Sequence, residues 1–146
     1  MITDLIRGDH FAAREILGDI GNSTQQAHEE RADAFARLAA LWAIHGDMMA
    51  GAVHPFLGAT RAWPDPVAAA TDLQKEVETL ANDLAALEAR EDPGWRTEYE
   101  RLRSVFEQQV RVEQMDLIPL LLDLPPDRIA EASRVSARLR GGAGPG

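Results

Sequence analysis

Residues 65–89, which read DPVAAATDLQKEVETLANDLAALEA, carry the clearest helical pattern of the sequence. Asp65 and Pro66 form a typical helix start, because an aspartate can cap a helix and proline suits the first helical position. After this start, apolar residues recur at alternating intervals of three and four, so they share one face of a helix. The segment therefore predicts a long helix that buries one stripe: Ala70, Leu73, Val77, Leu80, Leu84 and Leu87.

Three further segments, two before this one and one after it, carry stripes of the same spacing. The first stripe consists of Ile2, Ile6, His10, Ala13, Leu17 and Ile20. The second consists of Phe35, Leu38, Trp42, His45, Met49, Ala52 and Phe56. The last consists of Leu102, Phe106, Gln109, Glu113, Leu117 and Leu120.

Turn signals separate the stripes. Residues 23–26 (Ser-Thr-Gln-Gln) predict a capping box that opens the second helix. Asp92 with Pro93 repeats the helix-start signal before the last long helix, and Pro125 with Pro126 interrupts that helix. Short connections favour antiparallel neighbours. The sequence therefore predicts an all-α protein, with an up-down-up-down four-helix bundle over residues 1–124, a short amphipathic C-terminal helix over 125–140 and a disordered tail over 141–146.

The composition excludes several classes of function. The chain has 146 residues, a net charge of −9, 45% apolar residues, 5% aromatic residues and no cysteine. Nucleic acids and anionic membrane surfaces are not expected as partners, because both require a basic face. The lack of cysteine excludes disulfides, thiolate nucleophiles and cysteine-ligated metal sites. We recognise no secretory signal or membrane span, so a cytoplasmic protein is expected, with a homodimer left open.

Three strongly polar residues occupy positions on the apolar stripes: His10, His45 and Glu113. Gln109 lies one turn before Glu113 on the same face. Buried groups of this kind are normally paired with one another or bound to a metal, so both interpretations stay open at this point. His54 comes nine residues after His45, which puts it on the opposite side of the same helix, so a surface or helix-end residue is expected there.

These positions resemble the pattern of the hemerythrin-like (HHE) cation-binding family. His10, which follows an aspartate, resembles the histidine of that family's first helix. His45 with Pro55, and Glu113 with Pro119, resemble the His-x-x-x-Glu motifs of its second and fourth helices, where a proline comes ten residues after each histidine. The resemblance covers about residues 2–124 and implies a four-helix bundle with metal ligands in its interior.

Other residues stand at three of the family's ligand positions. Met49 takes the place of the second-helix glutamate, Val77 that of the third-helix histidine and Gln109 that of the fourth-helix histidine. In the family, the histidines of the first two helices hold one iron, those of the last two hold a second, and the two glutamates bridge them. The resemblance therefore implies that the second iron site is lost.

What remains is a set of two histidines and one carboxylate: His10, His45 and Glu113. The resemblance implies a mononuclear site for one divalent transition metal, with iron expected and zinc as the alternative, or a decayed site that holds none. The implied role is sensing of oxygen, nitric oxide or redox state, or metal handling. No catalytic residue is assigned, and whether the protein is an enzyme stays open.

The alternative is a metal-free helical bundle. In that interpretation, a central cavity lined by Val77, Met49, Trp42 and Phe106 binds an apolar small molecule or a partner helix. The polar trio would then only satisfy its own hydrogen bonds.

Overall fold

A computed structural model describes residues 1–58, 65–89 and 93–141. Within these ranges the chain forms helices and short turns and contains no β-strand, which confirms the prediction of an all-α protein. The elements are α1 (Ile2–Gly21), α2 (His28–Met48), η1 (Met49–Val53), α3 (His54–Leu57), α4 (Pro66–Ala89), α5 (Trp95–Val112), η2 (Glu113–Leu117), α6 (Ile118–Leu122) and α7 (Pro126–Gly141).

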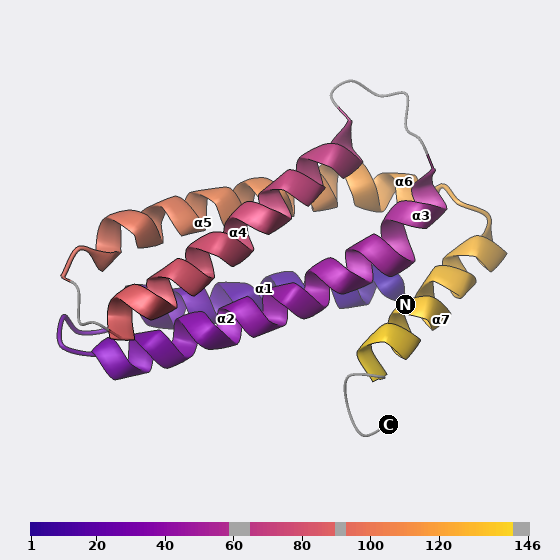
Figure 1. The fold of residues 1–146 in the computed structure, drawn as a ribbon. Helices are drawn as coiled ribbons and strands as arrows, with labels where there is room; N and C mark the ends of the chain where they lie inside the picture. The colour runs from indigo at the N-terminus through magenta and orange to yellow at the C-terminus, as the bar shows by residue number, and fades with distance from the viewer. Residues whose placement is uncertain (59–64, 90–92, 142–146) are drawn as a thin grey trace.

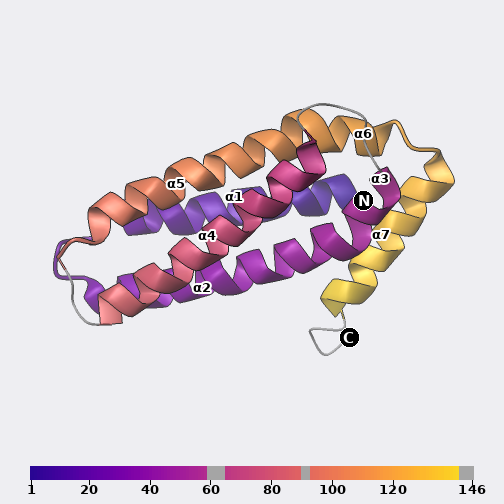
Figure 2. The same ribbon diagram turned by 45° about the horizontal axis from the view of Figure 1, so that its top comes forward.

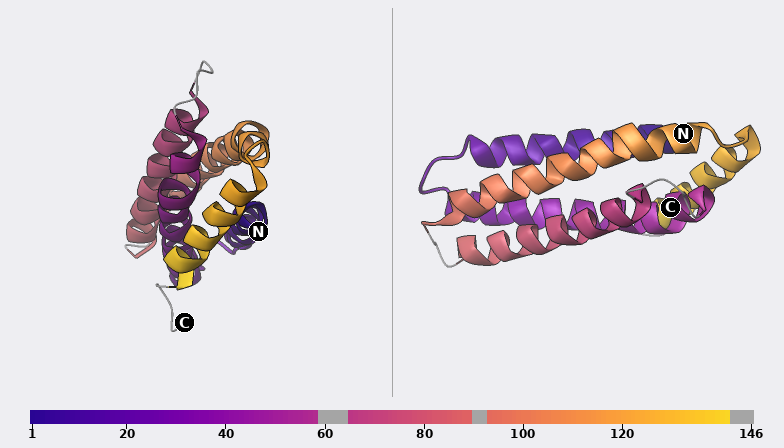
Figure 3. Two further views of the ribbon diagram at one scale, coloured as in Figure 1. Left: turned by 90° about the vertical axis from the view of Figure 1, so that its right-hand side faces the viewer. Right: turned by 90° about the horizontal axis from the view of Figure 1, so that it is seen from above.

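The four longest helices, α1, α2, α4 and α5, lie lengthwise beside one another (Figure 1, Figure 2). The shorter helix α7 crosses one end of these helices, near the N-terminus (Figure 3). There the backbone N–H of Ile2 donates a hydrogen bond to Ser133 Oγ at 3.0 Å. The first and last described helices therefore meet at the same end of the molecule.

The interior contains two clusters of buried apolar side chains. One cluster includes Ala13, Trp42 and Val110 and extends toward the end where α1 joins α2. The other includes Ile6 and Met48 and lies toward the end crossed by α7. On the four long helices and the turn η2, polar residues lie between the positions that belong to one cluster and those that belong to the other. These polar residues therefore form a layer between two apolar regions.

The predicted stripes match the observed burial along most of their length. Every stripe residue of α1 is buried, and the second stripe is buried from Phe35 to Ala52, whereas Phe56 is half-buried. Helix α4 begins at Pro66 as predicted, and Asp65 Oδ1 accepts a hydrogen bond from the backbone N–H of Val67 at 2.9 Å. The local helix-start signal is thus confirmed for the helix with the clearest pattern.

Two other predictions of helix starts meet a different outcome. The predicted capping box is wrong, because α2 begins only at His28 and Ser23 Oγ donates to the carbonyl of Ile20 in the preceding turn instead. Helix α5 begins at Trp95, two residues after Pro93, while Asp92 lies outside the described residues.

Two wide, π-helical turns, η1 and η2, interrupt the regular helices that the periodicity predicted. In η1 the N–H of His54 bonds to the carbonyl of Met49, and in η2 the N–H of Ile118 bonds to that of Glu113, each five residues back rather than four. A proline follows each turn, at positions 55 and 119. Proline has no N–H and clashes with the carbonyl four residues before it, and a wider turn relieves that clash.

The second wide turn changes which side chains face inward after it. Leu120, predicted on the buried stripe, is 37% exposed, whereas Ile118 and Leu121 are buried. The prediction for Leu120 is wrong because the stripe assumed an uninterrupted helix. A π-helical turn rotates the following residues relative to a regular helix.

Helix α7 occupies the place of the predicted C-terminal helix and extends one residue further, to Gly141. Gly141 therefore belongs to the helix and not to the predicted tail, whose residues 142–146 lie outside the described part of the chain. A Cβ on Gly51 would lie 2.8 Å from a methyl group of Leu139, so this glycine allows α7 to approach η1 closely. Within the described ranges, no helix combines the length and apolar character needed to cross a membrane.

Candidate metal centre

His10, His45 and Glu113 come from three helical segments and meet in the polar layer. His10 Nε2 lies 2.7 Å from Glu113 Oε1, and His45 Nε2 lies 2.8 Å from the same oxygen. Each of the three side chains is at most 1% exposed. The residues singled out by sequence thus share one buried point of contact.

A carboxylate and a guanidinium lie behind His45. Asp9 Oδ2 is 2.8 Å from His45 Nδ1, on the side of the ring away from Glu113. Arg140, near the end of α7, donates to both oxygens of Asp9, each at 2.8 Å. The last described helix is therefore joined to the site through an ion pair and one shared carboxylate.

The two histidine rings are also held by their other neighbours. Gln114 Nε2 lies 3.4 Å from His10 Nδ1, and the Nε2 atom on the other side of the ring faces Glu113. Trp42 stacks on the His45 ring with centroids 4.4 Å apart and planes inclined by 19°. Both Nε2 atoms are thereby aimed at the same position.

Gln109 and Gln74 extend the polar layer toward α4. Gln109 Oε1 accepts from Trp42 Nε1 at 2.9 Å, and Gln109 Nε2 donates to Gln74 Oε1 at 2.7 Å and to Glu113 Oε2 at 3.0 Å. Gln74 Nε2 in turn donates to the backbone carbonyl of Trp42 at 2.6 Å. Since these groups satisfy one another, Gln109 is a fixed part of the network around Glu113.

Hydrogen bonding outweighs burial in setting the charges of this group. Burial lowers the pKa of His45, but hydrogen bonds to Asp9 and Glu113 prevail and raise that pKa to about 9. Burial raises the pKa of Glu113, but hydrogen bonds from His10 and His45 prevail and lower that pKa to about 2. The pKa of Asp9 is also lowered, because bonds from His45 and Arg140 overcome burial. At neutral pH, His45 is therefore an imidazolium held between two carboxylates.

The donor set fits a single divalent transition metal. Imidazole nitrogens and carboxylate oxygens are the ligands that zinc and non-haem iron take in proteins. One ligand atom from each of the three residues lies within 4.8 Å of the others. Ligand atoms about 2.1 Å from one ion are about 3.0–3.4 Å apart, so the contacts around Glu113 would need to open by only about half an ångström. Asp9 behind His45 is the kind of outer carboxylate that orients a metal-binding imidazole.

The positions where the resemblance lacked ligands are filled by packed or hydrogen-bonded side chains. Met49 is 2% exposed and belongs to the apolar cluster near α7, and Val77 is fully buried in the other cluster. Gln109 is bonded to three neighbouring residues. Within the described residues, the one group of histidines and carboxylates with metal-binding geometry is therefore His10, His45 and Glu113.

Sequence reasoning missed Asp9 and Arg140 as parts of the site. Asp9 precedes His10 in the sequence, but it stands off the apolar stripe, and nothing local indicates its contact with His45. Arg140 is 131 residues away from Asp9, on a helix that was predicted only as a terminal amphipathic segment. No periodicity reports such a contact, because it depends on how α7 crosses the end of the other helices.

The expectation of a surface position for His54 is wrong, whereas the helix-end alternative agrees with its place as the first residue of α3. His54 is half-buried, its Nε2 atom is enclosed without a hydrogen-bond partner, and the residue lines a cavity that also reaches Glu113. The expectation counted nine residues of regular α-helix from His45. The π-helical turn η1 lies within that interval and changes the rotation.

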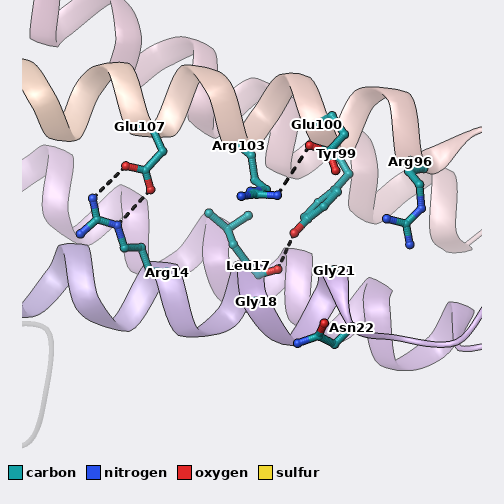
Figure 4. Close-up of a pocket in the computed structure, with 10 residues that line it drawn as sticks. All are labelled: Arg14, Leu17, Gly18, Gly21, Asn22, Arg96, Tyr99, Glu100, Arg103 and Glu107. Carbon is teal, nitrogen blue, oxygen red and sulfur yellow. Dashed lines mark hydrogen bonds and ion pairs between the residues drawn. The ribbon is translucent and has the colours of Figure 1, made fainter.

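A second hollow lies between α1 and α5, where Arg14, Arg96 and Arg103 gather (Figure 4). Each of these arginines already has a partner. Arg14 forms a bidentate ion pair with Glu107 at 2.8 and 2.9 Å. Arg103 Nη1 lies 3.7 Å from a carboxylate oxygen of Glu100. The guanidinium of Arg96 stacks over the Trp95 ring, 4.6 Å from its centroid. Ion pairs with Glu107 and Glu100 therefore neutralise Arg14 and Arg103, whereas Arg96 keeps its charge against the face of the Trp95 ring.

Comparisons with known proteins give no relative for this chain: no family model, no curated protein and no solved structure matches it. The hemerythrin-like resemblance therefore rests on the positions quoted from the sequence.

Proposed function

We propose that this protein is a hemerythrin-like metal-binding protein, an up-down-up-down four-helix bundle that holds one divalent transition metal through His10, His45 and Glu113. The observation that carries the proposal is the convergence of two imidazole Nε2 atoms on one carboxylate oxygen, at 2.7 and 2.8 Å, in a layer between two apolar clusters. The side-by-side packing of α1, α2, α4 and α5 agrees with that architecture (Figure 1).

Iron is the expected metal and zinc the alternative, because both accept two histidines and a carboxylate. A bound iron ion would supply positions open to a small ligand and a change of redox state. A role in sensing oxygen, nitric oxide or redox state, or in metal handling, follows from that chemistry. A cytoplasmic location agrees with the lack of cysteine.

The chain's own residues would prepare the site in two ways. Asp9, fixed by Arg140, holds the His45 ring so that its Nε2 atom faces Glu113. The Nε2 proton of His45 must leave before that nitrogen can bind a cation, and Asp9 keeps the proton on the other nitrogen. Trp42 and Phe106, whose rings meet edge to face at 5.1 Å, exclude water from one side of the layer.

The decisive experiment is metal analysis of protein purified without chelator. We expect at most one iron or zinc ion per chain, and none in the single variants His10→Leu and His45→Leu. His28→Leu is the matched control, because His28 pairs with Glu88, and neither residue belongs to the metal-binding group. Wild-type protein that takes up no iron or zinc when these metals are supplied in excess would refute the proposal. Two metal ions per chain would show that other residues form a second site.

A second candidate, the metal-free bundle that binds a small molecule, is favoured by one observation. A cavity of about 190 Å³ reaches Glu113 from the surface between α2 and α4. Of the residues expected to line such a cavity, Met49 does so, whereas Val77, Trp42 and Phe106 are packed within an apolar cluster. The exposed wall of the cavity is mainly apolar with a smaller polar part, which agrees with a small, largely apolar ligand.

A further inference from the structure

The side-chain amides of Gln74 and Gln109 form a ring of hydrogen bonds with Trp42. Trp42 Nε1 donates to Gln109 Oε1 at 2.9 Å, and Gln109 Nε2 donates to Gln74 Oε1 at 2.7 Å. Gln74 Nε2 donates to the backbone carbonyl of Trp42 at 2.6 Å, which closes the ring. Gln109 Nε2 also donates to an atom outside the ring, Glu113 Oε2, at 3.0 Å.

The ring permits one orientation of each amide. An indole N–H can only donate and a backbone carbonyl can only accept, so Trp42 fixes which end of each glutamine amide it meets. If the Gln109 amide were turned over, its NH₂ group would face the indole N–H and its oxygen would face Glu113 Oε2. Both contacts would then be repulsive, so the network assigns an N–H of Gln109 to that carboxylate oxygen.

The central members of this network are buried. Trp42 is fully buried, and Gln109 and Glu113 are each 1% exposed. Both N–H groups of Gln109 have acceptors within the network. A buried polar atom that loses its partner destabilises the folded protein, so the Gln109 amide is held firmly in place.

Gly46 makes room for the ring. A Cβ at this position would lie 2.6 Å from Gln74 Nε2, so a larger residue would displace that amide. Gly46 lies within α2, where glycine is a poorer helix former than alanine. Helix propensity therefore does not account for this glycine, whereas the approach of Gln74 from α4 to the Trp42 carbonyl does.

The two oxygens of Glu113 consequently have different neighbours. Oε1 lies 2.7 Å from His10 Nε2 and 2.8 Å from His45 Nε2, whereas Oε2 accepts from Gln109. A carboxylate can bind a metal through one oxygen or through both. For Glu113 to bind through both, Oε2 would have to give up the amide N–H.

We propose that Gln109 is a positioning residue that restricts Glu113 to binding a metal through Oε1 alone. Trp42 and Gln74 hold the Gln109 amide in the orientation that this requires. The role rests on the proposed metal-binding function and adds how the carboxylate is presented. A carboxylate that binds through one oxygen occupies one coordination position instead of two, so the centre keeps a further position open for a small ligand.

The test compares infrared spectra of the full chain with and without zinc. The spectrum of zinc-loaded protein minus that of chelator-treated protein shows the carboxylates that change on binding. The separation between the antisymmetric and symmetric carboxylate stretches is larger for binding through one oxygen than through both. We expect the larger separation in the wild type.

Gln109→Met removes the N–H and keeps a side chain of similar length. The separation should decrease in this variant because Oε2 is released to the metal, and the affinity for zinc should fall about 10- to 100-fold. Gln108→Met is the matched control, because Gln108 is the exposed neighbour of Gln109 on the same helix. This control should leave both the separation and the affinity unchanged.

Gly46→Ala disturbs the ring without altering any polar side chain. Displacement of Gln74 removes one bond that holds Gln109, so the separation should also decrease, and zinc affinity should fall about two- to tenfold. The melting temperature should not fall by more than a few degrees, since alanine is the better helix former. A change in the separation at an unchanged melting temperature distinguishes positioning of Glu113 from a general loss of stability.

The outcomes separate this inference from the metal-binding proposal. A wild type that takes up neither zinc nor iron would refute the proposed function, and the positioning role with it. A wild type that binds zinc through both oxygens of the carboxylate would overturn the positioning role alone. So would a folded Gln109→Met whose separation and zinc affinity match those of the wild type. If Gln109→Met does not fold, Gly46→Ala decides, and an unchanged separation and affinity in that variant would overturn the role.

Discussion

His45 is held by hydrogen bonds at both of its ring nitrogens, by Asp9 at Nδ1 and by Glu113 at Nε2. A proton on Nε2 and a metal ion at Nε2 exclude each other. The pair of carboxylates that raises the pKa of His45 to about 9 therefore also sets how strongly a metal must compete with that proton.

Metal affinity should accordingly depend on pH. Binding releases the Nε2 proton of His45, so the apparent affinity for Zn²⁺ should rise by up to about tenfold per pH unit between about pH 6.5 and 8.5. Competition with a chromogenic chelator measures the affinity, and a weakly buffered titration measures the released proton. In Asp9→Asn, which lacks one of the two carboxylates, the rise should occur at lower pH. An affinity that is constant over this range would show that His45 does not give up a proton to the metal.

The same residue predicts a pH dependence of stability in chelator-treated protein. The pKa of His45 rises on folding from 6.5 to about 9, so its contribution is complete below pH 6.5 and is lost as the pH rises through 9. The pKa of Glu113 falls from 4.5 to about 2, so its contribution is present above pH 4.5 and is lost as the pH falls through 2. The His45 shift corresponds to about 3 kcal/mol as an upper value.

Urea unfolding at pH 6 and pH 9.5 checks this prediction. The free energy of unfolding should fall more between these two pH values in the wild type than in His45→Gln, which keeps a polar side chain but does not titrate. Since the other titrating groups are the same in both proteins, the difference between the two slopes isolates His45. Equal slopes would contradict the raised pKa.

At the scale of single elements, the apolar stripes predicted where the long helices lie but not where their register changes. The stripes of α1 and α4 are regular, and their residues are buried or half-buried as expected. After η1 and η2 the expectations of a surface position for His54 and a buried position for Leu120 are wrong. Pro55 and Pro119 are visible in the sequence, but a proline can end a helix, kink it or widen one turn, and local sequence does not decide among these.

Helix α7 provides a prediction at this scale. Among its arginines, Arg140 is the one with described bonds to Asp9, and through them the helix contacts the site. Arg140→Leu removes both bonds to Asp9 and leaves that carboxylate with His45 as its remaining charged partner. We expect a loss of about 1–3 kcal/mol in the free energy of unfolding and about 10- to 100-fold in metal affinity.

Arg138→Leu is the matched control, because Arg138 is an exposed arginine two residues earlier on the same helix. This change should alter stability by about 0.5 kcal/mol or less and leave metal affinity unchanged. Thermal unfolding and chelator competition measure both quantities. If the two substitutions have the same effect on metal affinity, Arg140 does not support the site.

At the scale of the whole molecule, the polar layer between two apolar clusters was partly predictable. His10, His45, Gln109 and Glu113 were identifiable because a polar residue on an apolar stripe is conspicuous. Arg140 was not, since its contact joins residues 131 positions apart. The all-α fold class follows from the periodicity of the sequence. The contact of Arg140 with the site depends instead on how α7 crosses the end of the long helices.

A triple variant tests whether a bound metal stabilises the folded chain. A metal that binds only the folded chain adds about 2.7 kcal/mol at a hundredfold excess over Kd, so a strong chelator should lower the melting temperature of the wild type by several degrees. His10→Leu, His45→Leu, Glu113→Leu removes all three ligands together and should melt below the metal-loaded wild type, with no response to chelator.

The result that would count against metal support is a triple variant that melts no lower than the untreated wild type. Replacing a buried polar network completely by apolar side chains can be neutral or stabilising when no metal is involved. Calorimetry of both proteins, with and without chelator, distinguishes the two cases.

The wide turns η1 and η2 make this molecule sensitive to the number of its residues as well as to their kind. Ten positions separate His45 from Pro55, and ten separate Gln109 from Pro119. Removing or adding one residue within either interval would rotate the following segment by about 100°. Such a change would turn His54 away from the cavity that it lines, or Leu121 away from the core, without altering any side chain. Between these positions, natural variation should therefore consist of substitutions, and gaps in an alignment should fall elsewhere.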